Sequence, residues 1–238
     1  MHLSTCILLI TVTPAEWSAI LLSLKVAGLS TVIAIPFALP IGWFLARNIF
    51  YGKSVIEGFL HLPLVMPPVT TGYLLLIILG TKGILGGWLY DHFGIQLAFN
   101  QTAAVIAAIV VSFPLMTRSI RTAIEMVDPD LEAASRTLGV SPLITFFRIT
   151  VPLALPGIIS GVVLGFARAL GEFGATITFA GNIEGKTRTI PIAVYSYMQT
   201  PGREASTLRL VIISAIIALA AMIVAEYLNR RVMRRHAQ

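Results

Sequence analysis

The chain has 238 residues, of which 56% are hydrophobic and only 12% charged, and its mean hydropathy is +0.87. An average soluble domain carries about 25% charged residues, so this composition excludes a freely soluble globular protein. The net charge of +6 is not read as a nucleic-acid surface, because the basic residues flank apolar runs. One cysteine and four scattered histidines predict neither a disulfide nor a metal site. The chain is therefore expected to lie in lipid.

Charge-free apolar runs predict the membrane spans in chain order. The first run, Val26 to Ala46, covers about 31 Å at 1.5 Å per residue, enough for a bilayer core of about 30 Å. Its helix is expected to begin earlier, because Thr13-Pro-Ala-Glu16 has the spacing of a capping box. The other expected spans are 58–81, 92–117 with helix only after Asn100, one starting near Val151, and 210–225 with an entry turn around Ser206. The predicted fold is an all-α polytopic membrane bundle of five helices.

The segment 153–181 allows a second count of the membrane elements. It is rich in glycine and contains Arg168 and Glu172, so it is long and interrupted for a single helix. A tilted, broken or re-entrant segment here would raise the number of membrane elements to six.

The distribution of Lys and Arg predicts the orientation. With the carboxyl terminus in the cytoplasm, the inner side holds about twice as many Lys and Arg residues as the outer side. The amino terminus is therefore expected outside. The apolar stretch from Cys6 to Val12 lacks a basic flank and a small-residue cleavage site, so a cleaved signal peptide is not expected.

The loop at 118–151 is too polar to span a membrane and too regular to be disordered. Asp128-Pro129 predicts the start of a helix, and Gly139 predicts its carboxyl-terminal cap. Ser141-Pro142 repeats the start signal for a second short amphipathic helix ahead of Pro152. Two such helices suit docking in a groove of another protein. A connecting loop that lies on the membrane surface explains the pattern equally well.

Arg168 and Glu172 are four residues apart in an apolar run, so a helix places them on one face. Ions within a membrane are costly and usually face a partner, a cavity or a pathway, which favours a pathway or gate role. The alternative is a neutralising pair that only locks two helices. Three prolines between 63 and 68 are expected to kink the second span, either to permit opening or only to shape packing.

The polar loop also carries a family resemblance. Glu132-Ala-Ala-Ser-Arg-Thr-Leu-Gly139, followed by nine residues and then Ile149-Thr-Val-Pro152, resembles the EAA loop of ABC importer permeases. The sequence departs from that pattern by one extra residue before the glycine and by Val151 in place of leucine. The resemblance implies that the residues that couple to an ATPase are Glu132, Ala133, Ala134, Gly139, Ile149 and Pro152.

Three further segments, 61–69, 112–118 and 166–176, are similar to the molybdate type of these permeases, and sulfate, thiosulfate or tungstate permeases remain alternatives. The resemblance implies one permease domain over 1–238, a homodimer, two cytoplasmic ATPase subunits that hold the ATP, and an external oxyanion-binding protein. It also implies a bacterial or archaeal cytoplasmic membrane. In this family the stretch that matches 166–176 lies along the translocation pathway, so the predicted gate residues are Arg168, Gly171, Glu172 and Gly174.

No catalytic constellation is visible, so we expect neither enzyme activity nor a cofactor in this chain. The segment Gly181 to Thr187 imitates a phosphate-binding loop, but that spacing requires a glycine where the chain has Ala180. It is interpreted as an external turn. A secondary transporter that works without ATP is the hypothesis from another class, although Glu172 is the one clear acid inside a span.

Overall fold

The computed structural model describes residues 12–236, with side chains through Arg231, and in this part of the chain all regular structure is helical. The predicted all-α fold is confirmed. The expectation for Cys6 to Thr11 lies outside the described residues. In chain order the elements are α2 (Pro14–Arg47), α3 (Lys53–Val65), α4 (Pro68–Leu79), α5 (Ile84–Phe93), α6 (Gln101–Glu125), α7 (Pro129–Thr137), α8 (Pro142–Thr145), the π-turn η1 (Phe146–Thr150), α9 (Val151–Leu170), α10 (Gly174–Phe179), α11 (Ile190–Met198) and α12 (Glu204–His236).

Within residues 12–236, four helical segments are long and apolar enough to cross a bilayer: α2, α6, the continuous helix Pro142–Leu170, and α12. The pair α3 and α4 also passes this test when taken together, which brings the count to five. The expected number of spans is thus confirmed. The alternative of six membrane elements expected an interrupted segment at 153–181, and the chain does break there between α9 and α10. The six residues of α10 cover about 9 Å, so this element is too short to cross a bilayer by itself.

The second span is broken rather than kinked. Its two halves meet at an angle of 110°. Met66 and Pro67 have extended backbones, since a residue that precedes proline is disfavoured in the helical region. Pro68 begins α4, where a missing N–H costs nothing. The prolines therefore set a sharp turn in the chain.

The centre of the bundle is α6, which packs against α2 on one side and α9 on the other. Small residues allow a close approach, because a Cβ added at Gly157 would lie 2.3 Å from the Cβ of Ala123. Ala103, Ala104, Ala107 and Ala108 of α6 are fully buried in the same way. In lipid the hydrophobic effect does not drive helices together, so membrane helices associate through close packing of small residues.

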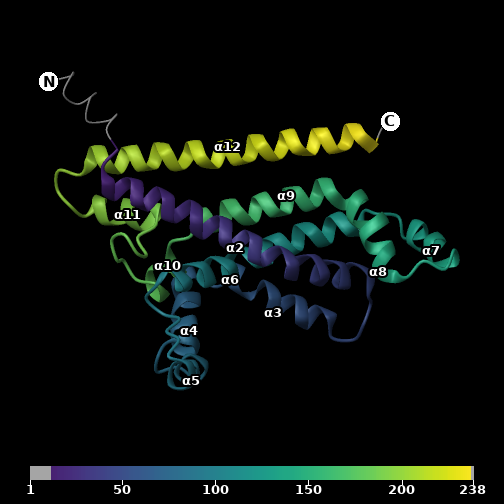
Figure 1. Cartoon of the computed structure of the whole chain (residues 1–238), viewed down its shortest axis with the longest axis horizontal. Helices are drawn as coiled ribbons and strands as arrows, with labels where there is room; N and C mark the ends of the chain where they lie inside the picture. Colours follow the sequence, from purple (N-terminus) through teal and green to yellow (C-terminus); the bar gives the residue numbers. More distant parts are fainter. Residues whose placement is uncertain (1–11, 237–238) are drawn as a thin grey trace.

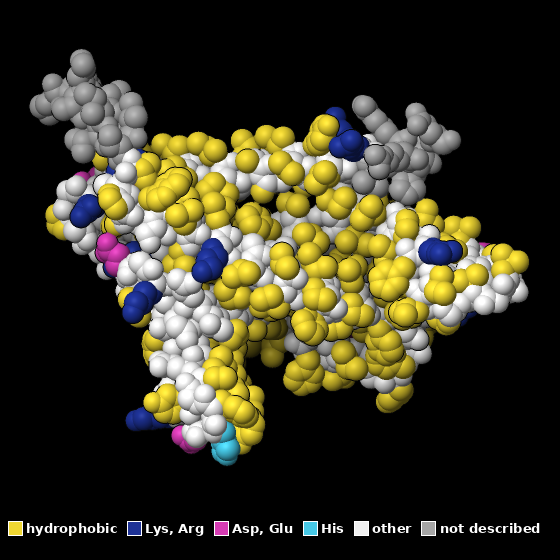
Figure 2. All heavy atoms as spheres, viewed as in Figure 1, with side chains coloured by type: hydrophobic (Ala, Val, Ile, Leu, Met, Phe, Trp, Pro, Cys, Tyr) yellow, Lys and Arg dark blue, Asp and Glu magenta, His cyan; other side chains and the backbone are white. Residues whose placement is uncertain are grey.

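Figure 1 shows the arrangement around this centre. α12 runs along one side of the bundle, α4 and α5 project from the opposite side, and α7 and α8 lie at one end. Figure 2 shows apolar side chains spread over the sides of the bundle, as expected for a surface that faces lipid.

The boundaries of the polar loop differ from the expectation. α6 continues through Arg118 to Glu125, so the connecting segment starts at Met126. The predicted end of the second short helix ahead of Pro152 is wrong, because α8 continues through η1 into α9. The π-turn, in which the N–H of Val151 donates to the carbonyl of Phe146, widens the helix next to the proline and lets the chain pass without a break.

Candidate coupling site and translocation pathway

The segment between α6 and α9 has the caps that its sequence predicts. The Asp128 carboxylate accepts a hydrogen bond from the N–H of Asp130 at 2.9 Å, which caps α7. Gly139 has φ +81°, its N–H donates to Arg136 O at 2.9 Å, and the N–H of Val140 donates to Ser135 O at 3.2 Å. This is a Schellman motif, and its left-handed position explains the glycine.

Glu132 lies inside the segment and joins three parts of the chain. Its side chain is only 7% exposed, and its Oε1 accepts hydrogen bonds from Arg47 Nε at 3.1 Å, Arg47 Nη2 at 3.0 Å and Thr150 Oγ1 at 2.7 Å. Arg47 also donates to the carbonyl of Val127 at 2.8 Å. The glutamate therefore fixes α7 against the end of α2 and against η1.

The outer side of the segment exposes several large apolar side chains alongside the charged Arg136 and Arg148. Ala133, Ala134 and Gly139 are exposed, whereas Ile149 and Pro152 are partly buried. The hydroxyls of Ser135 and Thr145 lie 3.0 Å apart and hold α7 to α8. The large apolar side chains exposed on this face are Leu131, Leu138, Leu143, Ile144 and Phe147. Of the six residues predicted to couple, Glu132 thus supports the face from within, while the alanines and the glycine lie on it.

The predicted intramembrane pair is formed. Arg168 Nη1 lies 2.7 Å from Glu172 Oε2, and the glutamate is 2% exposed whereas the arginine is 28% exposed. The other carboxylate oxygen of Glu172 accepts the N–H of Ala175 at 2.8 Å, which caps the first turn of α10. Glu172 thus bridges the end of α9 and the start of α10.

The break between α9 and α10 lies against the start of α4. A Cβ added at Gly174 would lie 2.8 Å from the Cβ of Pro68, and one added at Gly72 would lie 2.6 Å from the carbonyl oxygen of Ala175. Gly171 ends α9, and a Cβ added there would lie 3.7 Å from the carbonyl oxygen of Ala167, an ordinary contact distance. The structure therefore brings all four predicted gate residues to one junction, beside the break in the second span.

Sequence reasoning missed the pair of Arg47 and Glu132, and it also missed a buried ion pair between α2 and α12. Arg209 Nε and Nη2 donate to the two oxygens of Glu16 at 3.0 and 2.6 Å, and both side chains are almost fully buried. The capping box of Thr13 and Glu16 is formed as predicted. In the sequence the cap alone accounts for the glutamate, and no local pattern points from Glu16 to Arg209, which lies 193 positions away.

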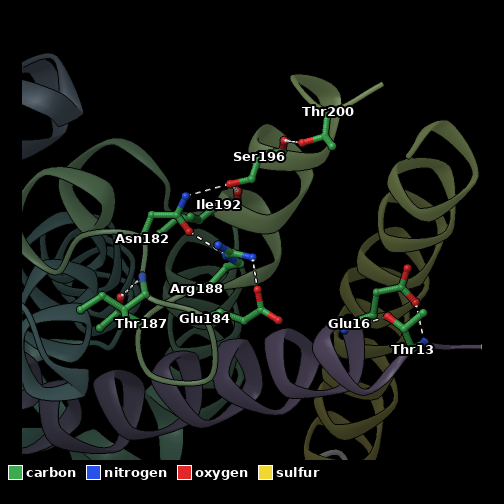
Figure 3. A network of polar contacts seen from close by, with 10 residues as sticks. Thr13, Glu16, Asn182, Glu184, Thr187, Arg188, Ile192, Ser196 and Thr200 are labelled. Carbon is green, nitrogen blue, oxygen red and sulfur yellow. Dashed lines mark hydrogen bonds and ion pairs between the residues drawn. The ribbon is translucent and has the colours of Figure 1, made fainter. Parts of the chain in front are cut away.

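The turn at Gly181 to Thr187 is tied to α11 by a polar network (Figure 3). Asn182 receives a hydrogen bond from Arg188 Nε at 2.7 Å and donates to Ser196 Oγ at 2.8 Å. Arg188 also pairs with Glu184 at 2.7 Å. These contacts give the turn a fixed shape. Asn182 and Glu184, which lie in the segment that resembles a phosphate-binding loop, therefore have a structural role.

Apolar spans, a folded polar segment with exposed apolar side chains at one end, and an ion pair at a helix break are together the architecture of a membrane transport subunit. The family model described as "Binding-protein-dependent transport system inner membrane component" matches residues 38–234, and the chain belongs to this family.

Within this family, the chain is similar to individual proteins over nearly its whole length. The chain is 55% identical over 218 residues to the molybdenum transport system permease protein ModB of Escherichia coli strain K12, a match that covers 92% of this chain and 95% of the relative. It is 51% identical over 223 residues to ModB of Haemophilus influenzae, with 94% and 97% covered.

Solved structures share the fold. A bacterial ABC transporter involved in the import of alginate superposes with a TM-score of 0.76 at 17% identity, covering 97% of this chain and 84% of that one. The MetNI methionine ABC transporter in an inward-facing conformation gives a TM-score of 0.70 at 15% identity, covering 93% and 99%.

Proposed function

We propose that this chain is the membrane permease of an ATP-driven importer for molybdate. The observation that carries the proposal is the identity of 55% to a molybdenum transport permease over nearly the whole chain. Tungstate, sulfate and thiosulfate are tetrahedral dianions of similar size and are the alternative cargoes. An external binding protein is expected to choose among them, because specificity requires a pocket built around the anion.

The open face of α7 and α8 is the proposed docking surface for an ATPase subunit. Its exposed leucines, isoleucine and phenylalanine suit burial in a groove of a cytoplasmic partner. A homodimer would present two such faces to two ATPases, which hold the ATP. Because Glu132 ties α7 to α2 and to η1, motion of the docked ATPase would pass directly into two spans.

The junction of α9, α10 and α4 is the proposed gate. Arg168 keeps part of its side chain exposed while Glu172 is buried, so the cationic partner of the pair is the one an oxyanion could approach. The glutamate neutralises much of that charge, which suits brief passage rather than tight binding. The close contacts at Gly174 and Gly72 mean that α10 and α4 would move together as the gate alternates between the two sides.

The orientation follows from the same assignment. Docking of α7 and α8 to a cytoplasmic ATPase puts the carboxyl end of α12 in the cytoplasm and the amino terminus outside, in agreement with the bias in Lys and Arg. The fixed turn at Gly181 to Thr187 would then face the external binding protein, and its exposed Glu184 and Lys186 are candidates for that contact.

Transport assays in liposomes test the proposal. The chain, its ATPase and its binding protein would be reconstituted together, and uptake of labelled molybdate measured with and without ATP. We expect uptake that requires both ATP and the binding protein, and competition by excess molybdate that exceeds competition by sulfate. Uptake by the chain alone under an ion gradient would instead establish the secondary transporter.

A further inference from the structure

A groove between α9 and α12 has no role in the proposed transport cycle. It encloses about 630 Å³ and is lined by Ser160, Val163 and Leu164 of α9 and by one face of α12 from Met222 to Arg230. Figure 2 shows a gap between the middle of α12 and the body of the bundle. α12 is the most apolar of the spans and buries only 17% of its apolar window inside the chain, so the groove opens toward the membrane.

The lining of the groove changes along its length. Toward Met222 it is apolar, with Val163, Leu164 and Ile223 as its walls. Toward Arg230 it becomes polar, and the amide of Asn229 donates to Ser160 Oγ at 2.8 Å across the gap between the helices. From Met222 to Arg230 the helix rises about 12 Å, which matches the upper part of a lipid acyl chain. An apolar slot with a polar mouth is the shape that a phospholipid fills.

The polar mouth also carries charged side chains. Arg230 is 68% exposed and pairs with Glu226 at 2.7 Å, and Arg231 is exposed beside it. Glu226 offsets the charge of one of these two arginines, so the mouth carries an excess of one positive charge. Basic pockets between spans attract the headgroups of anionic lipids.

We propose that this groove binds an anionic phospholipid of the phosphatidylglycerol class. Its phosphate lies near Arg230, with Arg231 next along the helix at the rim, and an acyl chain lies along Val163, Leu164 and Met222. A second copy of the chain is a poorer occupant. Two copies in one membrane have the same orientation, so pairing through this face would bring their arginine-rich ends together. The inference needs only that α12 spans the membrane, and it does not depend on the cargo.

Native mass spectrometry of the purified full chain, with whatever subunits remain bound, tests the proposal. The probe is phosphatidylglycerol added to detergent micelles in competition with phosphatidylethanolamine. R230Q/R231Q removes two charges at the mouth, and we expect about 30-fold weaker retention of phosphatidylglycerol, since each basic residue near a membrane contributes about one factor of five to six. L164W fills the apolar slot without a change in charge, and we expect a comparable loss.

The control is K82Q/K186Q, which removes the same charge from two exposed lysines far along the chain from the groove. It should retain phosphatidylglycerol as the unaltered chain does. Equal retention by all three variants, or a preference for phosphatidylethanolamine, would overturn the proposal. A loss of dimer mass in R230Q/R231Q and L164W without a loss of lipid would do so too, because it would assign the groove to the second copy. Circular dichroism of L164W and R230Q/R231Q checks that the helices remain folded.

Discussion

Arg47 and Glu132 lie 85 positions apart in the chain and form an ion pair that is only 14% and 7% exposed. The arginine is the last residue of α2, and the glutamate lies in the first turn of α7. The pair therefore joins the end of a membrane span to the helix that we assign to ATPase docking. Removal of either partner leaves the other with its charge largely buried, a change that costs about 3 kcal/mol.

We expect E132A to uncouple ATP hydrolysis from transport. Loss of the ion pair and of the bond from Thr150 should free α7 from α2 and η1, so that the docked ATPase moves α7 without moving the spans. Molybdate uptake should fall at least about tenfold per ATP hydrolysed, because the broken contact exceeds 1.4 kcal/mol. The measurement is the ratio of uptake to phosphate release in liposomes.

E226A is the matched control, since Glu226 is an exposed glutamate whose pair with Arg230 is open to solvent. It should leave the ratio of uptake to hydrolysis within about twofold of its original value. A double-mutant cycle with R47A separates the pair from each residue alone. An unchanged ratio in E132A, with the protein still inserted and dimeric, would rule out the coupling role.

The pair of Arg168 and Glu172 predicts different results for two kinds of variant. E172A removes both the partner of the arginine and the cap of α10, so we expect loss of assembly as well as of transport. R168Q/E172Q removes both charges, while the amide oxygen introduced at position 172 can still accept the N–H of Ala175 and cap α10. If the pair is only a lock, this neutral variant keeps both dimer yield and transport. For a gate that attracts an oxyanion, we expect it to keep dimer yield while uptake falls at least about tenfold. Gel filtration and uptake measure the two effects separately.

Two glycines of the broken span predict opposite effects of the same substitution. G72A would place a Cβ 2.6 Å from the backbone carbonyl of Ala175, so it should separate α4 from α10 and destabilise the chain by about 2 kcal/mol. G58A in α3 meets nothing within 4 Å and should stabilise by about 0.5 to 1 kcal/mol, since alanine is the better helix former. The measurement is the midpoint of thermal unfolding in detergent. A lower midpoint in G58A than in G72A would contradict the close contact.

The buried pair of Glu16 and Arg209 should stabilise the contact between α2 and α12. E16A removes both the bidentate pair and the capping box, and we expect it to cost about 3 to 4 kcal/mol. E16A/R209A should cost less than the sum of the single variants, because it leaves no buried charge behind. E204A, an exposed glutamate in the first turn of α12, is the control and should change the midpoint little. Additive costs in the double variant would exclude a direct pair.

The sequence predicted what depends on local pattern. The cap at Asp128, the left-handed Gly139 and the capping box at Thr13 were all predicted, because each is fixed within four or five residues. The spans were predicted because lipid imposes one length and one composition. The pair Arg168 and Glu172 was found because its spacing is helical and local.

Contacts between segments far apart in the chain could not be predicted from the sequence. Nothing near Arg47 indicates Glu132 as its partner, and Glu16 and Arg209 lie 193 positions apart. The π-turn at Phe146 to Thr150 was missed for a related reason. A proline normally ends a helix, and only the three-dimensional course of α8 into α9 shows that the wider turn absorbs it. The same limit applies to Glu132. The sequence suggested that it contacts the ATPase directly, whereas its buried contacts place it beneath the docking face.

Substitutions of Gly139 can separate the effect of backbone strain from the effect of blocking the docking surface. At φ +81° any residue with a Cβ is strained by about 1 kcal/mol, yet nothing lies within 4 Å of an added Cβ, so even a large side chain would project from the open face. We expect G139A to lower coupling slightly, through fraying of the end of α7, and G139W to abolish it by obstructing the ATPase. Hydrolysis and uptake in liposomes, with retention of the ATPase on purification, measure both effects.

Gly185 is the matched control, because it has φ +74° and the same open surroundings but lies in the turn before α11. G185A and G185W carry similar strain at the opposite end of the proposed topology, so both should retain the ATPase fully. If G139W retained the ATPase as well as G185W does, the open face of α7 and α8 would not be the docking surface. If G139A and G139W were equally impaired, the defect would lie in the helix cap, since strain is common to both substitutions and side-chain size is not.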